Sequence, residues 1–229
     1  MSETDPKTRL LEAAKPHVPF DGWSETTLRL AAEETGIDRA LVDAVCPRGA
    51  VDLALAYHEA GDAAMVAALE QADLGAMRFR DRVAFAVRTR LDLVEDRELV
   101  RRGMTLFALP QYAGDGTRAL WRTADRIWTA LGDTSQDINW YTKRATLSGV
   151  YSSTVLYWLG DESEGREATW AFLDRRIDDV MQFEKVKGRV TGSRLFEGFM
   201  NGPGRVFEHI RAPGAPRPGY PGHWGGTRR

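Results

Sequence analysis

The chain contains a single cysteine, Cys46, among 229 residues, so it cannot form a disulfide within itself, which is typical of a reducing compartment. It has no apolar run of the roughly 20 residues that a membrane-spanning helix needs. The longest charge-free stretch, 145–160, is shorter than that and suits a buried helix. Acidic residues near the N-terminus, Glu3 and Asp5, fit neither a secretory signal nor a transit peptide. We therefore expect a cytoplasmic chain that does not span the membrane.

The sequence also lacks the motifs that mark common catalytic sites. None of its four histidines belongs to a Glu-x-x-His pair, and paired cysteines, Gly-x-Ser-x-Gly and a glycine-rich phosphate loop are missing. We interpret His58 as a surface or satisfied core residue, and Cys46 follows a helix end, where nothing lowers its pKa. These absences predict a binding protein, not an enzyme, with no metal and no cofactor.

What is present is helical periodicity from end to end, with almost no strand alternation. Asp5 with Pro6, Ser24 and Asp38 are predicted to begin three short helices. We expect longer helices at 50–71, 77–94, 97–106, 134–159 and 163–187, and a broken segment at 111–131. In the last helix Trp170, Leu173, Ile177, Val180 and Met181 form one apolar stripe. The fold class is therefore predicted to be all-α.

Composition divides the chain into four parts. Residues 1–49 hold the three short helices, and residues 50–190 the larger helical part. Residues 191–211 form a short amphipathic segment, and residues 212–229 a Pro-, Gly- and Arg-rich tail that we expect to be disordered.

The N-terminal pattern RLLEAA, FDGWSETTLRLAAEETG and IDRALVDAV resembles the DNA-binding end of TetR-type regulators. A turn at Gly36 allows two short helices to cross steeply. Leu28, Ala31, Ala32 and Leu41 are expected to pack between them.

The chemistry of a DNA reader is nevertheless missing from this region. Residues 21–62 carry nine acidic side chains against three arginines, Arg29, Arg39 and Arg48. A recognition helix needs cations for phosphates and forked donors for base edges, and an acidic surface repels a duplex. The overall net charge of −2 gives no reason to expect attraction to nucleic acid either. We therefore expect no nucleic-acid partner.

A second resemblance covers residues 8 to 187. The elements LWRTAD, DINWYT and TWAFLDRRI, together with HVPFDGW, are similar to the coenzyme Q (ubiquinone) biosynthesis accessory family, Coq-nine, whose members are TetR-like in fold. The resemblance implies a TetR-like helical bundle whose larger part binds lipid and dimerises.

That resemblance implies a function as well. It points to a non-enzymatic homodimer, peripherally associated with the inner membrane, that binds isoprenoid quinone intermediates. Such a protein presents demethoxyubiquinone to a separate di-iron hydroxylase. The alternative is a ligand-sensing TetR-type transcriptional repressor.

The Trp140–Tyr141 pair has two interpretations. With Asp133 or Thr134 as helix cap, Tyr141 lies on a stripe with Ile138 and Ala145, while Trp140 is displaced by about 100° and joins Arg144. Most tryptophans are largely buried, which favours core packing. The resemblance implies instead a surface patch that docks the hydroxylase, for which we select Asp137, Ile138, Asn139, Trp140, Tyr141, Lys143 and Arg144.

A lipid cavity is expected beside the charge-free stretch. Its small residues, such as Gly149 and Ser152, permit either close helix packing or an internal cavity. For a cavity, the expected lining residues are Met104, Leu106, Phe107, Trp121, Trp128, Leu147, Ser148, Tyr151, Ser152 and Val155.

The segment 194–211 is expected to contact the membrane. Apolar residues recur at three- and four-residue spacing with arginines between them, and 202–204 splits the segment into two short turns that a bilayer interface would order. The alternative is packing against the protein's own body. The proposed contact residues are Leu195, Phe196, Phe199, Met200, Phe207 and Ile210.

Overall fold

All regular elements in the described part of the chain are helices. The computed structural model describes the backbone of residues 5–191 and Pro213, and the side chains of residues 5–182 and Pro213. No strand occurs among these residues, which confirms the all-α prediction. The helices are α1 (Pro6–Ala14), α2 (Val18–Asp21), α3 (Glu25–Thr35), α4 (Arg39–Val45), α5 (Ala50–Gln71), α6 (Phe79–Asp92), α7 (Arg97–Phe107), α8 (Ala113–Ala130), α9 (Ile138–Gly160) and α10 (Glu167–Thr191), with 3-10 turns at Leu74–Ala76 and Glu164–Arg166.

Side-chain caps begin the short N-terminal helices where the sequence predicts them. The Asp5 carboxylate accepts a hydrogen bond from the Thr8 amide at 3.2 Å, and Pro6 occupies the first turn of α1. Ser24 and Asp38 cap α3 and α4, with amide-to-oxygen distances of 3.3 Å and 2.9 Å. Each such cap stabilises its helix by about 1 kcal/mol.

The turn between α3 and α4 is made by Gly36, whose φ of +65° lies in the left-handed region that favours glycine. Leu28 and Ala31 are buried between the helices, as expected. Leu41 is not, since 38% of it is exposed, and Val42 is buried in its place. Val42, one residue later on this short helix, is the side chain that turns inward.

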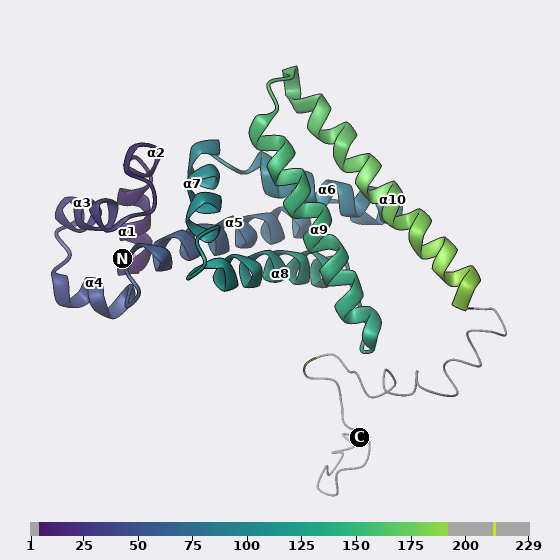
Figure 1. Cartoon of the computed structure of the whole chain (residues 1–229), viewed down its shortest axis with the longest axis horizontal. Coiled ribbons are helices and arrows are strands. Elements are labelled where there is room, and N and C mark those ends of the chain that lie inside the picture. The colour runs from purple at the N-terminus through teal and green to yellow at the C-terminus, as the bar shows by residue number, and fades with distance from the viewer. Residues whose placement is uncertain (1–4, 192–212, 214–229) are drawn as a thin grey trace, which may run out of the picture.

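Helix α5 joins the two ends of the molecule. Figure 1 shows α1–α4 grouped at one end of the molecule, with α5 and α8 running away from them. At the far end α9 lies across α5 and α8, and α10 lies beyond α9. The hydrophobic core has two parts. The first unites α1–α4 with the start of α5 and with α7, and it includes Leu10, Trp23, Leu53 and Leu99. The second unites α5, α6, α8, α9 and α10 and includes Met65, Val87, Ile127, Tyr151 and Trp158.

Residues 111–131 were predicted to be broken, and that prediction is wrong. The segment forms one helix, α8, from Ala113 to Ala130. Gly116 lies against α7, where a Cβ atom would come within 2.7 Å of the Phe107 Cβ. This glycine therefore permits close packing of α7 and α8 and does not interrupt the helix.

Helix α9 begins later than predicted. Its cap is Asp137, whose carboxylate accepts from the Asn139 amide at 2.9 Å, so neither Asp133 nor Thr134 caps it. Its buried face carries Arg144, Leu147, Val150, Tyr151, Thr154, Val155, Trp158 and Leu159. This is the face on which Trp140 was placed, not the face of Tyr141.

Helix α10 packs as its stripe predicts, with Leu173 and Ile177 buried and Trp170, Val180 and Met181 against the core. In Figure 1, α9 and α10 meet at the turn that joins them and diverge toward the start of α9.

Candidate functional site

A cavity of about 340 Å³ lies between α5, α6, α7, α8 and α9, and we call it the main cavity. Residues of all five helices line it, because α7 packs closely on the start of α8 and α9 packs across α8. Its wall is predominantly apolar. The larger apolar side chains that line it are Trp23, Leu91, Leu99, Met104, Phe107, Leu120 and Val155.

Two tyrosines and an arginine interrupt the apolar wall. Tyr57 comes from α5, Arg90 from α6 and Tyr151 from α9. Burial raises the pKa of Tyr57 to about 12 and raises the pKa of Tyr151 as well, although the charge of Arg90 opposes both shifts. Both phenols are therefore protonated at neutral pH and can donate hydrogen bonds into the cavity.

Arg90 is anchored by a buried carboxylate. Its Nε donates to Asp62 Oδ1 at 2.8 Å, and the two side chains are only 5% and 1% exposed. The Thr123 hydroxyl lies 3.0 Å from both Asp62 oxygens and 2.8 Å from His58 Nε2. Burial lowers the pKa of His58, so its ring is a neutral member of this network, in line with its interpretation as a satisfied core residue.

Gly61 makes room for the Arg90 guanidinium. A Cβ atom on Gly61 would lie 2.6 Å from Arg90 Cζ, closer than real contacts allow. The arginine thus lies against the backbone of α5, and its Nη2 donates to the His58 carbonyl at 3.2 Å. Gly61 and Asp62 together fix the position of the Arg90 guanidinium at the wall of the main cavity.

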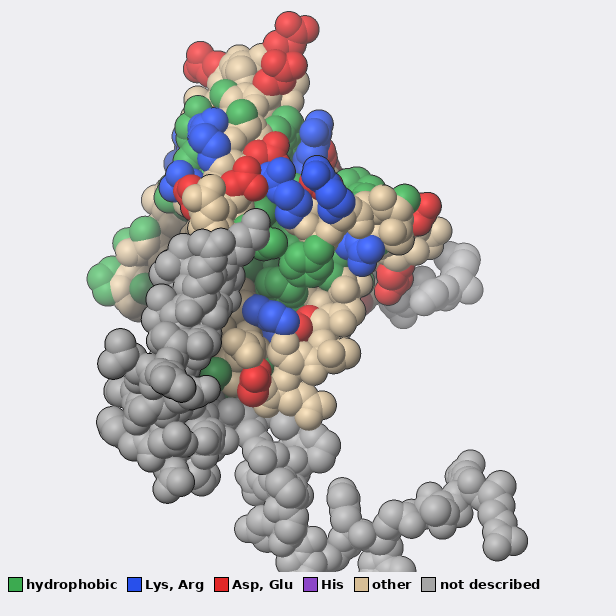
Figure 2. Space-filling view, turned by 90° about the vertical axis from the view of Figure 1, so that its right-hand side faces the viewer, with side chains coloured by type: hydrophobic (Ala, Val, Ile, Leu, Met, Phe, Trp, Pro, Cys, Tyr) green, Lys and Arg blue, Asp and Glu red, His purple; other side chains and the backbone are tan. Residues whose placement is uncertain are grey.

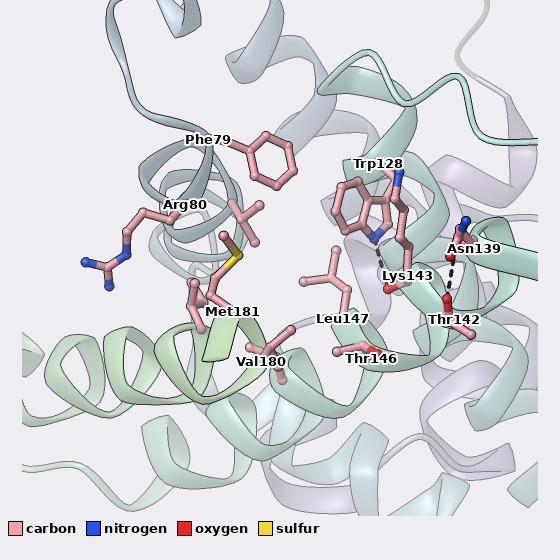
Figure 3. A pocket seen from close by; sticks show the side chains of 13 residues that line it. Phe79, Arg80, Trp128, Asn139, Thr142, Lys143, Thr146, Leu147, Val180 and Met181 are labelled. Atoms are coloured by element: carbon pink, nitrogen blue, oxygen red, sulfur yellow. Dashed lines mark hydrogen bonds between the residues drawn. The ribbon is translucent and has the colours of Figure 1, made fainter. Parts of the chain in front are cut away.

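A second cavity, of about 270 Å³, opens where α9 and α10 diverge. Figure 3 shows Phe79, Trp128, Leu147, Val180 and Met181 around it. Phe79 stacks on Trp128 with 5.7 Å between ring centroids, and Trp128 Nε1 donates to the Lys143 carbonyl at 3.0 Å. On the face turned toward the viewer in Figure 2, hydrophobic side chains gather in the middle with Lys and Arg side chains around them.

Trp140 and Tyr141 belong to an aromatic patch at the start of α9, which we define as Trp121, Trp140 and Tyr141. The Trp140 ring contacts Tyr141 and Trp121 at centroid distances of 4.8 Å and 5.9 Å. All three rings are half-buried. Arg144 lies over the Trp140 ring at 4.0 Å from its centroid. Trp140 and Tyr141 are thus neither buried in the core nor fully exposed. They form part of the surface, and neighbouring side chains hold their rings in place.

Buried charges hold this patch in place. Arg144 is 3% exposed and binds Asp125 at 2.6 Å and Asp133 at 3.0 Å. Burial of Asp133 would by itself raise its pKa, but hydrogen bonds from Lys143, Ser135 and Arg144 outweigh that effect and lower the pKa to about 2. Asp133 therefore stays ionised and fixes the start of α9.

The structure divides the predicted lipid-cavity residues into three groups. Met104, Phe107, Tyr151, Ser152 and Val155 line the main cavity. Trp128 and Leu147 line the second cavity instead, because α9 separates the two. Three residues line neither: Trp121 belongs to the aromatic patch, Leu106 packs with the N-terminal core, and Ser148 donates to the Arg144 carbonyl.

The predicted docking residues do lie together. Asp137, Ile138, Asn139, Lys143 and Arg144 all belong to the first turns of α9 or its cap; Arg144 contacts the ring of Trp140, whereas Asn139 and Lys143 line the second cavity. Arg144 is buried, so it supports the patch from beneath.

Sequence reasoning missed Arg90 and Asp62, although a signal for them was present. Arg90 follows Val83, Ala86 and Val87 on the buried stripe of α6. Asp62 similarly precedes Met65 and Leu69 on α5. Opposite charges on the apolar faces of two successive helices indicate a buried ion pair.

Each of the three arginines between residues 21 and 62 is paired with a carboxylate. Arg29 binds Glu33 at 2.7 Å, Arg39 binds Asp43 at 2.9 Å, and Arg48 binds Asp52 at 2.6 Å.

Two further observations concern the described residues alone. They contain no group of three or more His, Cys, Asp or Glu side chains placed to hold a metal ion. None of their helices is long and apolar enough to cross a membrane. The predicted membrane contact at 194–211 lies outside the described residues.

The fold has a counterpart among solved structures. A TetR transcriptional regulator from Nitrosomonas europaea superposes with a TM-score of 0.60, over 76% of this chain and 97% of that chain. At 19% identity this likeness concerns the fold alone, and it confirms the TetR-like all-α fold.

Sequence comparisons identify the family. The COQ9 family model matches residues 113–184, which hold α8, α9 and much of α10. The chain is 34% identical to the rat "Ubiquinone biosynthesis protein COQ9, mitochondrial" over 87% of this chain and 67% of that protein. It is 33% identical to the Drosophila melanogaster protein of the same name, over 81% of this chain and only 58% of that protein. The human protein is 31% identical, over 87% of this chain and 65% of that protein. The chain belongs to the COQ9 family.

Proposed function

We propose that this chain is a non-enzymatic, lipid-binding protein of ubiquinone biosynthesis that takes isoprenoid quinone intermediates from the membrane and presents them to a di-iron demethoxyubiquinone hydroxylase. The observation that carries the proposal is the main cavity, which residues of five helices line and whose wall is mainly apolar. The names of the relatives supply the pathway.

The size of the main cavity limits what it can hold. At about 340 Å³ it lies near the lower end of the range of small-molecule sites, about 300–1,000 Å³. A substituted ring and the first part of an isoprenoid chain match that volume. The rest of a long chain extends beyond it, which suits a protein that presents its ligand and does not enclose it.

The aromatic patch supports the presentation step. Half-buried Trp and Tyr side chains at the start of α9, beside Asn139 and Lys143, have the composition of protein–protein hot spots. Trp140 needs no rearrangement to serve, because Arg144 already fixes its ring. The hydroxylase is proposed to dock here.

A second copy of the chain is proposed to cover the outer face of α9 and α10. Leu156 is 61% exposed there, and Tyr157 stacks on Phe172 at 4.7 Å between centroids. A two-fold pair through one apolar face is the commonest arrangement of soluble homo-oligomers. Light scattering should give a dimer for the unaltered chain and a monomer for Leu156→Glu; an unaltered chain that is monomeric would contradict the dimer.

Membrane access is proposed to come from residues 194–211. Truncation after Lys187 should reduce co-sedimentation with liposomes, most clearly with anionic lipid, because the removed arginines add electrostatic attraction. Equal binding by the full and truncated chains would exclude this segment as the membrane contact.

The function is tested in vesicles that contain demethoxyubiquinone and the hydroxylase. Adding the full chain should raise the rate of hydroxylation, whereas the chain without the hydroxylase should give no product. A rate that does not respond to the chain at any concentration would refute the proposal.

A further inference from the structure

Three polar atoms, each from a residue that lines the main cavity, have no hydrogen-bond partner among the described residues. Arg90 uses Nε for Asp62 and Nη2 for the His58 carbonyl, which leaves Nη1 without an acceptor among the described residues. The hydroxyls of Tyr57 and Tyr151 likewise form no hydrogen bond within that part of the chain. These three donors therefore remain available to an acceptor on a ligand that occupies the main cavity.

The cavity wall around these three donors is largely apolar and, among the described residues, offers them no acceptor. Leu91 and Val155 lie beside them in the cavity lining, and Tyr151 is only 4% exposed. An apolar ligand that fills the cavity would leave these donors without any acceptor, which costs free energy. A ligand oxygen could accept hydrogen bonds from these donors. In an apolar site, a few such polar groups determine the orientation of the ligand.

The local charge selects the kind of oxygen. The positive charge of Arg90 is paired with Asp62 at 2.8 Å, and both side chains are buried; the second cation on Asp62, Arg126 at 3.5 Å, is 37% exposed and therefore screened by solvent. A carboxylate or phosphate would bring a second negative charge into this pair. A neutral acceptor, such as a quinone carbonyl or the oxygen of a phenol or methoxy group, needs only the unused N–H and the two O–H donors.

We propose that Arg90, Tyr151 and Tyr57 determine the specificity of the main cavity by binding the oxygenated ring of the ligand, so that the lipid enters ring end first. This inference rests on the proposed lipid-binding function and assigns the residues that recognise the head of the lipid. Gly61 is also required for this ring-binding site, because a side chain at that position would displace the Arg90 guanidinium. Met104 and Phe107 of α7 provide apolar wall for the first part of the chain.

The test uses three probes of equal or similar chain length. A dimethoxybenzoquinone with a decyl chain carries neutral ring oxygens, decylbenzene carries the ring without them, and dodecanoate carries a negative charge. Isothermal titration calorimetry on the delipidated full chain measures all three. We expect the quinone to bind at least about tenfold more tightly than decylbenzene, because two or three hydrogen bonds distinguish them.

The variants remove one hydroxyl at a time. Tyr151→Phe should weaken quinone binding by about three- to tenfold and leave decylbenzene binding unchanged. Tyr57→Phe should act in the same direction, and the double variant more strongly. Tyr112→Phe, which removes a phenolic hydroxyl from a residue that does not line the main cavity, is the matched control and should change neither affinity. The altered hydroxyls of the main cavity have no partner to lose, so the melting temperature should not fall.

The possible outcomes distinguish a failure of ring recognition from a failure of the proposed lipid-binding function. Equal affinity for quinone and decylbenzene, preference for dodecanoate, or unchanged quinone affinity in the double variant would each overturn ring recognition while leaving lipid binding intact. If the unaltered chain binds none of the probes and carries no lipid when purified, the proposed function itself fails.

Discussion

The guanidinium of Arg144 lies over the indole ring of Trp140, with Cζ 4.0 Å from the ring centroid. Arg144 is itself held by two carboxylates, Asp125 and Asp133, from the end of α8 and the loop before α9. A buried cation thus fixes the orientation of a half-buried ring at the surface. A ring that is already ordered loses little entropy on binding, which is a property of binding hot spots.

The first prediction concerns the docking patch. Trp140→Lys and Tyr141→Ala should each weaken binding of the hydroxylase, by about 2 kcal/mol or more if the rings act as hot spots. Surface plasmon resonance with immobilised hydroxylase measures the effect. Phe20→Ala, which removes a ring that is 82% exposed on α2, is the control and should bind normally.

Helicity and lipid content should stay near normal in both patch variants. Loss of helical circular dichroism in Trp140→Lys would mean that the ring belongs to the core and that the docking interpretation is wrong.

The second prediction separates the buried cation from its exposed neighbour. Arg144→Ala leaves Asp133 without its buried partner and should cost roughly 3–5 kcal/mol, or roughly 6–20 °C in Tm. Lys143→Ala removes a side chain that is 37% exposed and should cost about 1 kcal/mol or less. Equal losses in thermal melts of the two variants would contradict this assignment.

A third prediction follows from the lowered pKa of Asp133. Its folded-state pKa is about 2, below the ordinary 3.8, so its ionised form contributes stability above the unfolded pKa. That contribution is lost as the pH falls from about 4 toward 2. Asp133→Asn should lower Tm at pH 7 and flatten the fall of Tm with acid.

Asp174→Asn provides the comparison, because its carboxylate is 61% exposed and should leave the pH profile unchanged. A profile of Asp133→Asn that parallels the unaltered protein down to pH 2 would show that Asp133 does not carry the acid sensitivity.

The fourth prediction is that the chain has no specific affinity for duplex DNA. Arg39 of α4 is paired with Asp43, and acidic side chains outnumber cations across the helix-turn-helix region. Gel-shift assays at low salt should show no discrete complex. Sequence-dependent binding that survives physiological salt would favour the repressor instead.

Local rules predicted much of the fold. Helix α5 begins and ends where the pattern places it, at Ala50 and Gln71, because Gly49 precedes it and no proline lies within it. Ser24 and Asp38 cap their helices since this choice depends on a few neighbouring residues only.

Features that depend on distant contacts were not predictable in the same way. Asp133 is a good capping residue by sequence, yet Arg144 and Lys143 take up its carboxylate, so α9 begins at Ile138. Gly116 looks like an interruption until α7 is packed against it.

The candidate site was predictable only in part for the same reason. Helical spacing placed Tyr151, Ser152 and Val155 correctly at the main cavity, since they follow one face of α9. It assigned Trp121 and Trp128 to that cavity by their apolar character, but α8 turns them toward the aromatic patch and the second cavity. Arg90 and Asp62 required the pairing of two helices, which spacing alone does not give.

The central claim, that the main cavity holds a prenylated lipid, is tested most directly by denaturing solvent extraction and mass spectrometry of the chain purified from ubiquinone-producing cells. We predict isoprenoid quinone or a related long-chain lipid in the extract. Val155→Trp should reduce it by filling the cavity, whereas Ala145→Trp, at an exposed position of the same helix, should retain it. Folded Val155→Trp protein with the full lipid content, or unaltered protein that is consistently empty, would contradict the account.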